Sequence, residues 1–292
     1  MNCKRPYVIE NRFFACGRCL QCRIRRRTAW TLRMLHEAST ADDSLFVTLT
    51  YRDDQLMMRN GVPNLVPSDL RKFWKRLRIN LERTMIKRDI KYYACGEYGD
   101  ETQRPHYHAI LYGLSHPRSE EFIEETWSHG RVHVGTVSAD SIRYVAQYID
   151  KKLLGNASYF SDREQPFQVS SQGIGLSWLE TNLEKVLYEC SLLFKGKKYP
   201  LPKAYRKHIA RLFPAAAEGV SDRMIENATI AQCDFILTLA PHFGGESYDR
   251  LSFFQKCELA DLIRDNGVLI EKDLQAGMSF KKRVKGSKNN VV

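Results

Sequence analysis

The segment Pro105-His106-Tyr107-His108-Ala109-Ile110-Leu111 places two histidines on either side of a tyrosine. Its large apolar side chains predict a β-strand. Successive side chains of a strand point to opposite faces, so His106 and His108 share one face of the predicted sheet. Both imidazoles can then reach a single metal ion. The pattern therefore requires a strand at this point and predicts a metal site on one side of it.

A second group of polar side chains follows on a predicted helix, residues 139–153. Tyr144, Tyr148 and Lys151 occur at i, i+4 and i+7, so two hydroxyls and an ammonium lie along one stripe. A tyrosine oxygen attacks phosphorus once it has lost its proton, and because its ordinary pKa is about 10 a neighbouring cation must assist. Lys151 is the candidate cation. The alternative is an aromatic pair that packs the helix against the sheet.

Glu97 is the predicted third metal ligand. Residues 90–97 and 106–112 predict two strands joined by a loose hairpin loop, which brings Glu97 near His106. The alternative is an exposed carboxylate at the end of a hairpin. A hard cation such as Mg²⁺ or Mn²⁺ held by these three residues would polarise a phosphate. Imidazole ligands suit Mn²⁺ better than Mg²⁺, and the sequence leaves the choice open.

The other periodic segments of the first half complete an α+β pattern. They are a strand at 45–51, a helix from 68 or 69 to 81, a helix at 119–127 and a strand at 131–137. The resulting order is β-α-β-β-α-β-α. With antiparallel neighbours and helices on one face, this order predicts a ferredoxin-like antiparallel sheet.

The length of 292 residues is enough for one substantial core and a smaller attached domain. We expect three parts: a Cys-rich and Arg-rich arm and helix at 1–40, a sheet domain at 41–155, and a mostly helical region with a basic tail at 156–292. Within the last part, helical patterns run from 176 to 191 and follow Pro202, Ser221 and Ser252. A basic turn is expected at 194–200, and the basic tail at 281–290 is expected to be solvated.

Four cysteines near the start form the pattern C-x12-C-x2-C-x2-C, namely Cys3, Cys16, Cys19 and Cys22. Four thiolates with short inner spacing can close a tetrahedral structural Zn²⁺ site, and His36 is an alternative to Cys3 as the fourth ligand. An iron–sulfur cluster fits less well, because Arg26 stands where such a pattern needs its next cysteine. The remaining alternative is a set of reduced thiols in a partly buried arm.

Basic residues follow the cysteines directly. The chain has a net charge of +11 and a pI near 9.2, and Arg23, Arg25, Arg26 and Arg27 have no acidic neighbour. Guanidinium groups match phosphate oxygens, so these arginines predict DNA binding. A basic surface that only keeps the protein soluble is the alternative. No apolar run reaches the roughly 20 residues of a membrane span, and no signal peptide is apparent, so we expect a cytoplasmic protein without a membrane partner.

Three segments taken in order resemble a known family. Phe46-Val47-Thr48-Leu49-Thr50, His106-Tyr107-His108 and Tyr144-x-x-x-Tyr148-x-x-Lys151 resemble the three motifs of the HUH-endonuclease rolling-circle replication initiators. The longer pattern, with Cys16-x-x-Cys19-x-x-Cys22 and Gly96-Glu97-Tyr98-Gly99, is similar to the replication-associated proteins of microviruses, especially the gokushovirus-like single-stranded DNA phages.

The resemblance implies a DNA endonuclease and strand transferase. Such a protein nicks one strand at the viral origin, stays joined to the 5′ phosphate through tyrosine and later recloses unit-length circles. Its partners would be single-stranded and replicative-form viral DNA in the cytoplasm of a bacterial host. A host helicase and polymerase would also be needed, because no Walker-type phosphate loop is apparent. The alternatives are an HUH relaxase or transposase of a mobile element, and a non-catalytic, zinc-containing protein that binds single-stranded nucleic acid.

Overall fold

The computed structural model describes residues 3, 7–9, 12–84, 89–99, 101–114, 118–154 and 162–224. The chain forms two compact units, Cys16–Ala217 and Met1–Ala15 with Glu218–Val292. In the second of these, β1 (Tyr7–Ile9) and β2 (Arg12–Phe14) pair as an antiparallel hairpin. The helical pattern predicted after Ser252 and the basic tail lie outside the described residues. The three-part division of the chain stays a prediction.

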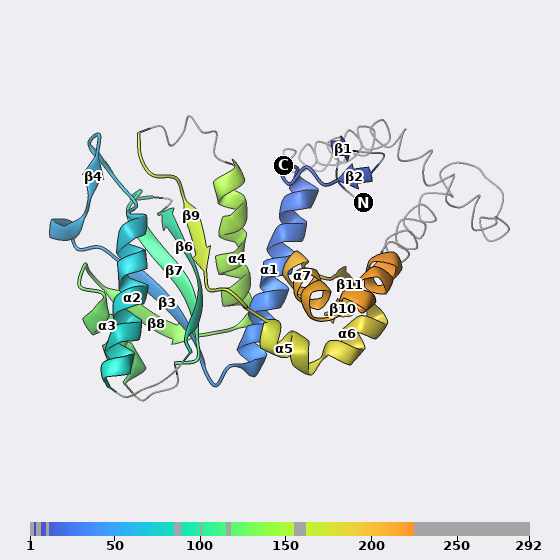
Figure 1. Cartoon of the computed structure of the whole chain (residues 1–292). Helices are drawn as coiled ribbons and strands as arrows, with labels where there is room; N and C mark the ends of the chain where they lie inside the picture. Colours follow the sequence, from blue (N-terminus) through green and yellow to red (C-terminus); the bar gives the residue numbers. More distant parts are fainter. Residues whose placement is uncertain are drawn as a thin grey trace, which may run out of the picture. The chain divides into compact units, whose positions relative to one another are not determined.

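A five-stranded antiparallel sheet forms the centre of the unit Cys16–Ala217 (Figure 1). Its order is β8-β3-β7-β6-β9, and its strands are β3 (Ser44–Thr50), β6 (Lys91–Tyr98), β7 (Pro105–Tyr112), β8 (Val132–Thr136) and β9 (Phe167–Ser170). The predicted α+β class and the order β-α-β-β-α-β-α are confirmed for β3, α2, β6, β7, α3, β8 and α4. Strand β9 was not predicted, because four residues carry too short a pattern to recognise.

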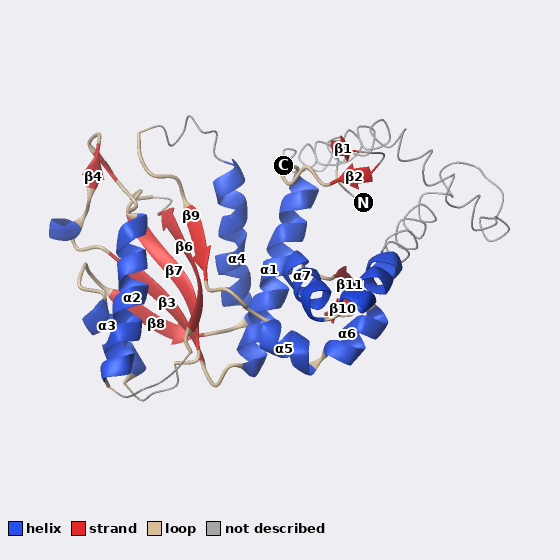
Figure 2. Cartoon of the chain, in the orientation of Figure 1, coloured by secondary structure: helices blue, strands red, loops and turns tan. Residues whose placement is uncertain are grey.

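Helices cover both faces of this sheet (Figure 2). On one face, α2 (Pro67–Arg83) and α3 (Ser119–Thr126) bury their apolar stripes against side chains such as Leu111. On the other, α1 (Leu20–Thr40) and α4 (Ala139–Leu154) pack over Ile110 and its neighbours. The prediction of helices on one face is therefore wrong. The physical reason is that β7 is apolar on both sides, as a central strand buried in a three-layer fold must be.

The remaining elements are short. They are η1 (Asp53–Gln55), β4 (Met58–Arg59), β5 (Val62–Pro63), α5 (Leu176–Thr181), α6 (Leu183–Glu189), β10 (Ser191–Phe194), β11 (Lys197–Pro200) and α7 (Lys203–Leu212). The helix predicted over 176–191 is two helices that meet at Asn182. The basic turn predicted at 194–200 is the turn and second strand of the β10–β11 hairpin. Among the helices of the described segments, none is long and apolar enough to cross a bilayer.

The segment after β9 is fastened to α1 by a buried carboxylate. Glu37 is 5% exposed and accepts a hydrogen bond of 2.6 Å from the backbone N–H of Gly175. Its other oxygen pairs with the Lys91 ammonium at 2.9 Å. Gly175 has a φ of +78°, and a Cβ there would lie 2.3 Å from the Tyr205 hydroxyl. Only glycine fits both the backbone conformation and the space.

His36 belongs to the same contact and not to the cysteine cluster. Its ring stacks on Trp178 with centroids 3.5 Å apart, and its Nδ1 hydrogen-bonds to the Tyr205 hydroxyl at 2.9 Å. On the straight helix α1 it lies about 21 Å from Cys22, at about 1.5 Å per residue. The alternative of His36 as a zinc ligand is therefore wrong, because the helix carries it to the opposite end of α1.

The burial of His36 predicts a measurable loss of stability in acid. Desolvation lowers the pKa of His36 to about 4, whereas an unfolded histidine has a pKa near 6.5. The unfolded chain therefore takes up a proton as the pH falls through this window while the folded chain does not, so the free energy of unfolding decreases. Since the ring is partly exposed, we expect about 1 kcal/mol from this group between pH 7 and pH 5.

Urea unfolding of the wild type and of His36→Phe at both pH values measures this contribution. The phenyl ring keeps the stacking on Trp178 but cannot titrate. Its loss of stability on acidification should be smaller than that of the wild type. Equal losses would show that His36 does not carry the effect.

Candidate active site

Glu97, His106 and His108 converge on one point of the sheet. The antiparallel register pairs Glu97 with His106 across β6 and β7, and His108 lies two residues further along β7 on the same face. One ligand atom from each residue lies within 4.8 Å of the others. The Nε2 atoms of His106 and His108 are 3.0 and 3.3 Å from the same Glu97 oxygen. The structure thus brings together the three residues predicted to hold a metal.

The outer contacts of the two rings orient them toward that point. His106 Nδ1 lies 3.2 Å from the backbone carbonyl of Arg104, and because a carbonyl only accepts, this nitrogen carries the proton. In the neutral ring, Nε2 then presents a lone pair to Glu97. His108 Nδ1 lies 3.0 Å from the Thr48 hydroxyl. A hydrogen-bonding oxygen behind each imidazole is the usual arrangement around a metal-bound histidine.

Burial makes a cation at this point favourable. The Glu97 side chain is 4% exposed and that of His108 10%, while that of His106 is 20% exposed. A buried carboxylate beside a lone pair is electrostatically unfavourable unless a cation lies between them. One carboxylate and two imidazoles are ligands that Mn²⁺, Zn²⁺ and related divalent ions accept. The group therefore fits a metal ion that is approached from the His106 side.

Tyr144 stands beside this group, on the same face of the sheet. Its ring centroid is 5.3 Å from that of His108 and 6.4 Å from that of Phe46, and the residue is 39% exposed. Ser138 and Ser141 fix the start of α4, because the Ser141 N–H donates to Ser138 Oγ at 3.1 Å and the Ser138 N–H to Ser141 Oγ at 2.8 Å. The helix thus begins at a defined point and presents Tyr144 to the imidazoles.

Tyr148 and Lys151 continue along α4, one and two turns after Tyr144. Their helical spacing is as predicted, which places all three residues on one stripe of the helix. Their side chains lie outside the described residues. The roles predicted for them therefore rest on the sequence.

Other tyrosines near the site are buried and bound. Tyr107, between the two histidines, points to the opposite face, where its hydroxyl bonds to that of Tyr51 at 2.8 Å. Burial raises the pKa of Tyr107 to about 12. Burial also raises the pKa of Tyr93 and of Tyr112 on the imidazole face. A buried phenol that resists ionisation cannot reach a DNA strand, so exposure singles out Tyr144 among these tyrosines.

Thr48 and Arg104 were not predicted to act at the site. Thr48 pairs with His108 in the register of β3 and β7, and its hydroxyl orients that ring. The signal was present, because Phe46, Thr48 and Thr50 alternate with the buried Val47 and Leu49 and so face the imidazoles. Arg104 acts through its backbone carbonyl, which no side-chain pattern reveals.

The arginines predicted to bind DNA lie in the first two turns of α1. Arg25 and Arg26 are exposed, while Arg23 and Arg27 are half-buried. Cys16, Cys19 and Cys22 gather at the same end of the helix, and Cys3 belongs to the other compact unit. Its predicted part in a zinc site therefore rests on the sequence spacing.

Removal of the Glu97 charge should weaken Mn²⁺ binding. Glu97→Gln keeps the shape of the side chain but replaces a carboxylate by a neutral amide, and we expect the affinity to fall at least about tenfold. Titration calorimetry with Mn²⁺ measures this, and the cysteines will not compete because Mn²⁺ prefers oxygen and imidazole ligands. Glu101→Gln, at an exposed position in the loop between the same strands, is the matched control. Equal affinities in the two variants would remove Glu97 from the ligand set.

Comparison with known proteins assigns a family. Residues 44–153 match the family model of the replication-associated protein ORF2. The N-terminal nuclease domain of the minute virus of mice non-structural protein-1 is a similar solved structure, at 11% identity over 56% of this chain and 81% of that one. Its TM-score of 0.23 is too low to carry an argument about the fold.

Three phage proteins are similar over most of the chain. The replication-associated protein VP4 of Bdellovibrio phage phiMH2K is 32% identical, with 66% of each chain covered. The replication-associated protein ORF2 of Spiroplasma virus 4 is 33% identical over 71% of this chain and 70% of that one. ORF4 of Chlamydia phage 1 is 28% identical over 70% and 55%. The chain thus spans about two thirds of the first two relatives and about half of the third, and it belongs to the family of phage replication-associated proteins that its resemblance to microvirus initiators predicted.

Proposed function

We propose that this protein initiates rolling-circle replication of a phage genome by cutting one DNA strand. The reaction is a metal-dependent transesterification that leaves the protein joined to the 5′ phosphate through a tyrosine. A later reversal of the same reaction rejoins the strand into a circle. Membership of the replication-associated family supports the broad activity, and the side chains of the site support the chemistry.

One observation carries the proposal. The exposed ring of Tyr144 lies 5.3 Å from His108, on the face of the sheet where Glu97, His106 and His108 meet. A phosphate bound at the three ligand residues would therefore lie next to a tyrosine hydroxyl. Proximity of this kind converts an attack between separate molecules into one within a complex.

The proposed step exchanges one phosphodiester for another. The Tyr144 or Tyr148 hydroxyl gives up its proton, its oxygen bonds to phosphorus, and the bond from phosphorus to the 3′ oxygen breaks. The 3′ oxygen takes up a proton and leaves as a free hydroxyl. Because the phosphotyrosine keeps the energy of the original bond, the same hydroxyl or a later one can reverse the step, which hydrolysis would not allow.

Glu97, His106 and His108 would hold a divalent metal ion beside this phosphate. When bound, the ion supplies Lewis-acid polarisation of the phosphate oxygens. Mg²⁺ and Mn²⁺ are the proposed ions, and two imidazoles favour Mn²⁺. The side chains themselves fix the position of the ion, since His106 is held by the Arg104 carbonyl and His108 by the Thr48 hydroxyl.

The helix α4 supplies the other parts of the proposed reaction. A second tyrosine, Tyr148, would allow a new cut while Tyr144 is still joined to DNA, which suits a process that must cut, copy and rejoin a circle. Lys151 would stabilise the negative charge on the phenolate and the phosphate. Each of these roles follows from position on the helix, at i, i+4 and i+7.

Arg23, Arg25, Arg26 and Arg27 would hold the phosphate backbone of single-stranded or replicative-form viral DNA near the origin. A host helicase and polymerase would then unwind and copy the strand in the bacterial cytoplasm. Two alternatives remain as outcomes of experiment: an HUH relaxase or transposase of a mobile element, and a zinc-containing protein that binds single strands without cutting them.

Formation of a covalent protein–DNA adduct tests the proposal. Labelled single-stranded oligonucleotides tiled across the encoding genome, with Mn²⁺, should yield one protein-linked 5′ fragment that marks the origin. Tyr144→Phe with Tyr148→Phe should abolish the adduct, because no phenolic oxygen remains on the stripe, while DNA binding measured by anisotropy persists.

Tyr188→Phe is the control, since Tyr188 is 78% exposed and lies on α6. It should form the adduct at the rate of the wild type. An adduct in the double variant would refute the assignment of the nucleophiles. Binding without an adduct in the wild type would favour the non-catalytic alternative.

A further inference from the structure

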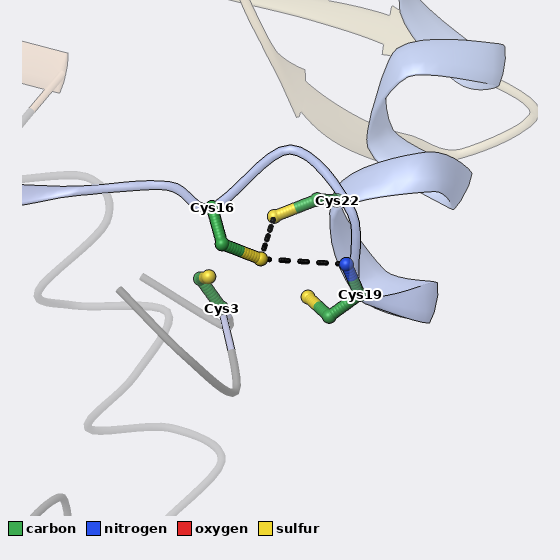
Figure 3. A group of neighbouring side chains, drawn as sticks. All are labelled: Cys3, Cys16, Cys19 and Cys22. Atoms are coloured by element: carbon green, nitrogen blue, oxygen red, sulfur yellow. Dashed lines mark hydrogen bonds between the residues drawn. The ribbon is translucent and has the colours of Figure 1, made fainter. Parts of the chain in front are cut away.

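Three cysteine sulfurs meet where helix α1 begins. Figure 3 shows Cys16 on the segment before the helix, Cys19 at its start and Cys22 in its first turn. Cys16 Sγ and Cys22 Sγ are 3.9 Å apart, and all three sulfurs lie within 4.8 Å of one another. Cys22 is 5% exposed and the other two are half-buried. The cluster lies wholly within the unit Cys16–Ala217.

The spacing of these sulfurs is that of a tetrahedral zinc site. Zn–S bonds of about 2.3 Å at tetrahedral angles place neighbouring sulfurs about 3.8 Å apart. The distance between Cys16 and Cys22 is within about 0.1 Å of this value. A disulfide instead brings two sulfurs to about 2.05 Å. The sulfurs are thus placed to share a ligand and not to bond to each other.

The backbone between the first two cysteines is shaped for a thiolate. The Cys19 N–H donates a hydrogen bond of 3.3 Å to Cys16 Sγ, which stabilises the charged form of the sulfur. Gly17 has a φ of +72°, the left-handed conformation that lets the chain turn back between Cys16 and Cys19. The Gly17 carbonyl also accepts a hydrogen bond of 3.5 Å from Arg26 Nη2. The loop is therefore tied to the helix that follows it.

The start of α1 lacks the usual stabilising groups. Its N-cap residue is Cys19, which makes no side-chain capping bond, and its first turn contains no acidic residue. Arginines follow at 23 and 25–27, which is unfavourable at the positive end of a helix dipole. A zinc ion bound by several thiolates carries net negative charge. Its presence here would offset both the dipole and the arginines.

We propose that Cys16, Cys19 and Cys22 bind a structural zinc ion that fixes the first turn of α1. The fourth ligand is Cys3, on the spacing of the sequence. Binding releases the protons of the thiols, and no electron transfer is involved. Zinc is preferred to an iron–sulfur cluster because Arg26 occupies the next ligand position of the common cluster pattern. The inference does not rest on the proposed strand cleavage.

Cobalt substitution of the full-length protein tests the site. Co²⁺ bound by thiolates gives a near-ultraviolet charge-transfer absorption, which a site of imidazole and carboxylate cannot give. The two metal groups of the chain are thereby distinguished. We expect the wild type to bind about one Co²⁺ with this band, and stoichiometric Zn²⁺ should displace it. An iron–sulfur chromophore in the purified protein, or no thiolate band on addition of Co²⁺, would overturn the proposal.

Single replacements identify the ligands. Cys16→Ser and Cys22→Ser should lose the band, and Cys3→Ser should weaken and shift it because one thiolate of the set is gone. Cys95→Ser and Cys190→Ser, at buried cysteines elsewhere in the fold, are the controls and should keep it. A full band in Cys16→Ser would refute the site, and a full band in Cys3→Ser would refute the fourth ligand.

Hydrogen exchange of the unaltered protein gives a readout that does not depend on the folding of variants. Removal of the metal by a chelator should increase amide exchange over residues 20–27, because the first turns of α1 lose their anchor. Exchange in β6 and β7 at the centre of the sheet should stay slow. Unchanged exchange at the start of α1 in protein shown to be free of zinc would contradict a structural role.

Discussion

The candidate site depends on the register of three neighbouring strands. Glu97 lies opposite His106, and Thr48 lies opposite His108, only because β6, β7 and β3 pair as they do. A slip of one residue would turn both histidines to the other face. The buried partners of β7 prevent this slip, because Tyr107 and Leu111 fill the core beneath α2 while Ile110 fills the core beneath α4. Packing on two faces thus fixes the geometry of a metal site that itself contributes little to the core.

The elements that could be predicted are those with a local signal. The strand containing His106 and the helix containing Tyr144 each carry a repeat of apolar residues, and the structure has them within a few residues of their predicted bounds. What failed depends on partners distant in the sequence. Strand β9 exists because its four residues pair with β6, and the second helical layer exists because β7 is apolar on both sides. Neither fact appears in a short window of sequence.

The same distinction holds within the site. Alternation along one strand and a hairpin were enough to group Glu97 with the histidines. The ring orientations were not predictable, because they depend on a backbone carbonyl at Arg104 and on the pairing of Thr48 with His108. Nor could the sequence rank the tyrosines, since burial alone separates the exposed Tyr144 from the enclosed Tyr112. Side-chain type predicts which chemistry is available, and packing decides which copies of a residue can use it.

Helix α1 couples the parts of the unit Cys16–Ala217. It packs along α4, which carries the tyrosines, and the Tyr112 hydroxyl donates to the Met34 carbonyl at 3.2 Å. Its Glu37 pairs with Lys91 at the start of β6, the strand on which Glu97 lies six residues later. Glu37 also accepts the Gly175 N–H, so the segment after the sheet presses α1 onto the strand. A buried carboxylate in this position must keep all its partners, because loss of any one leaves charge unpaired in the interior. The helix that carries the basic end is therefore held in a fixed orientation to both the metal ligands and the tyrosine helix.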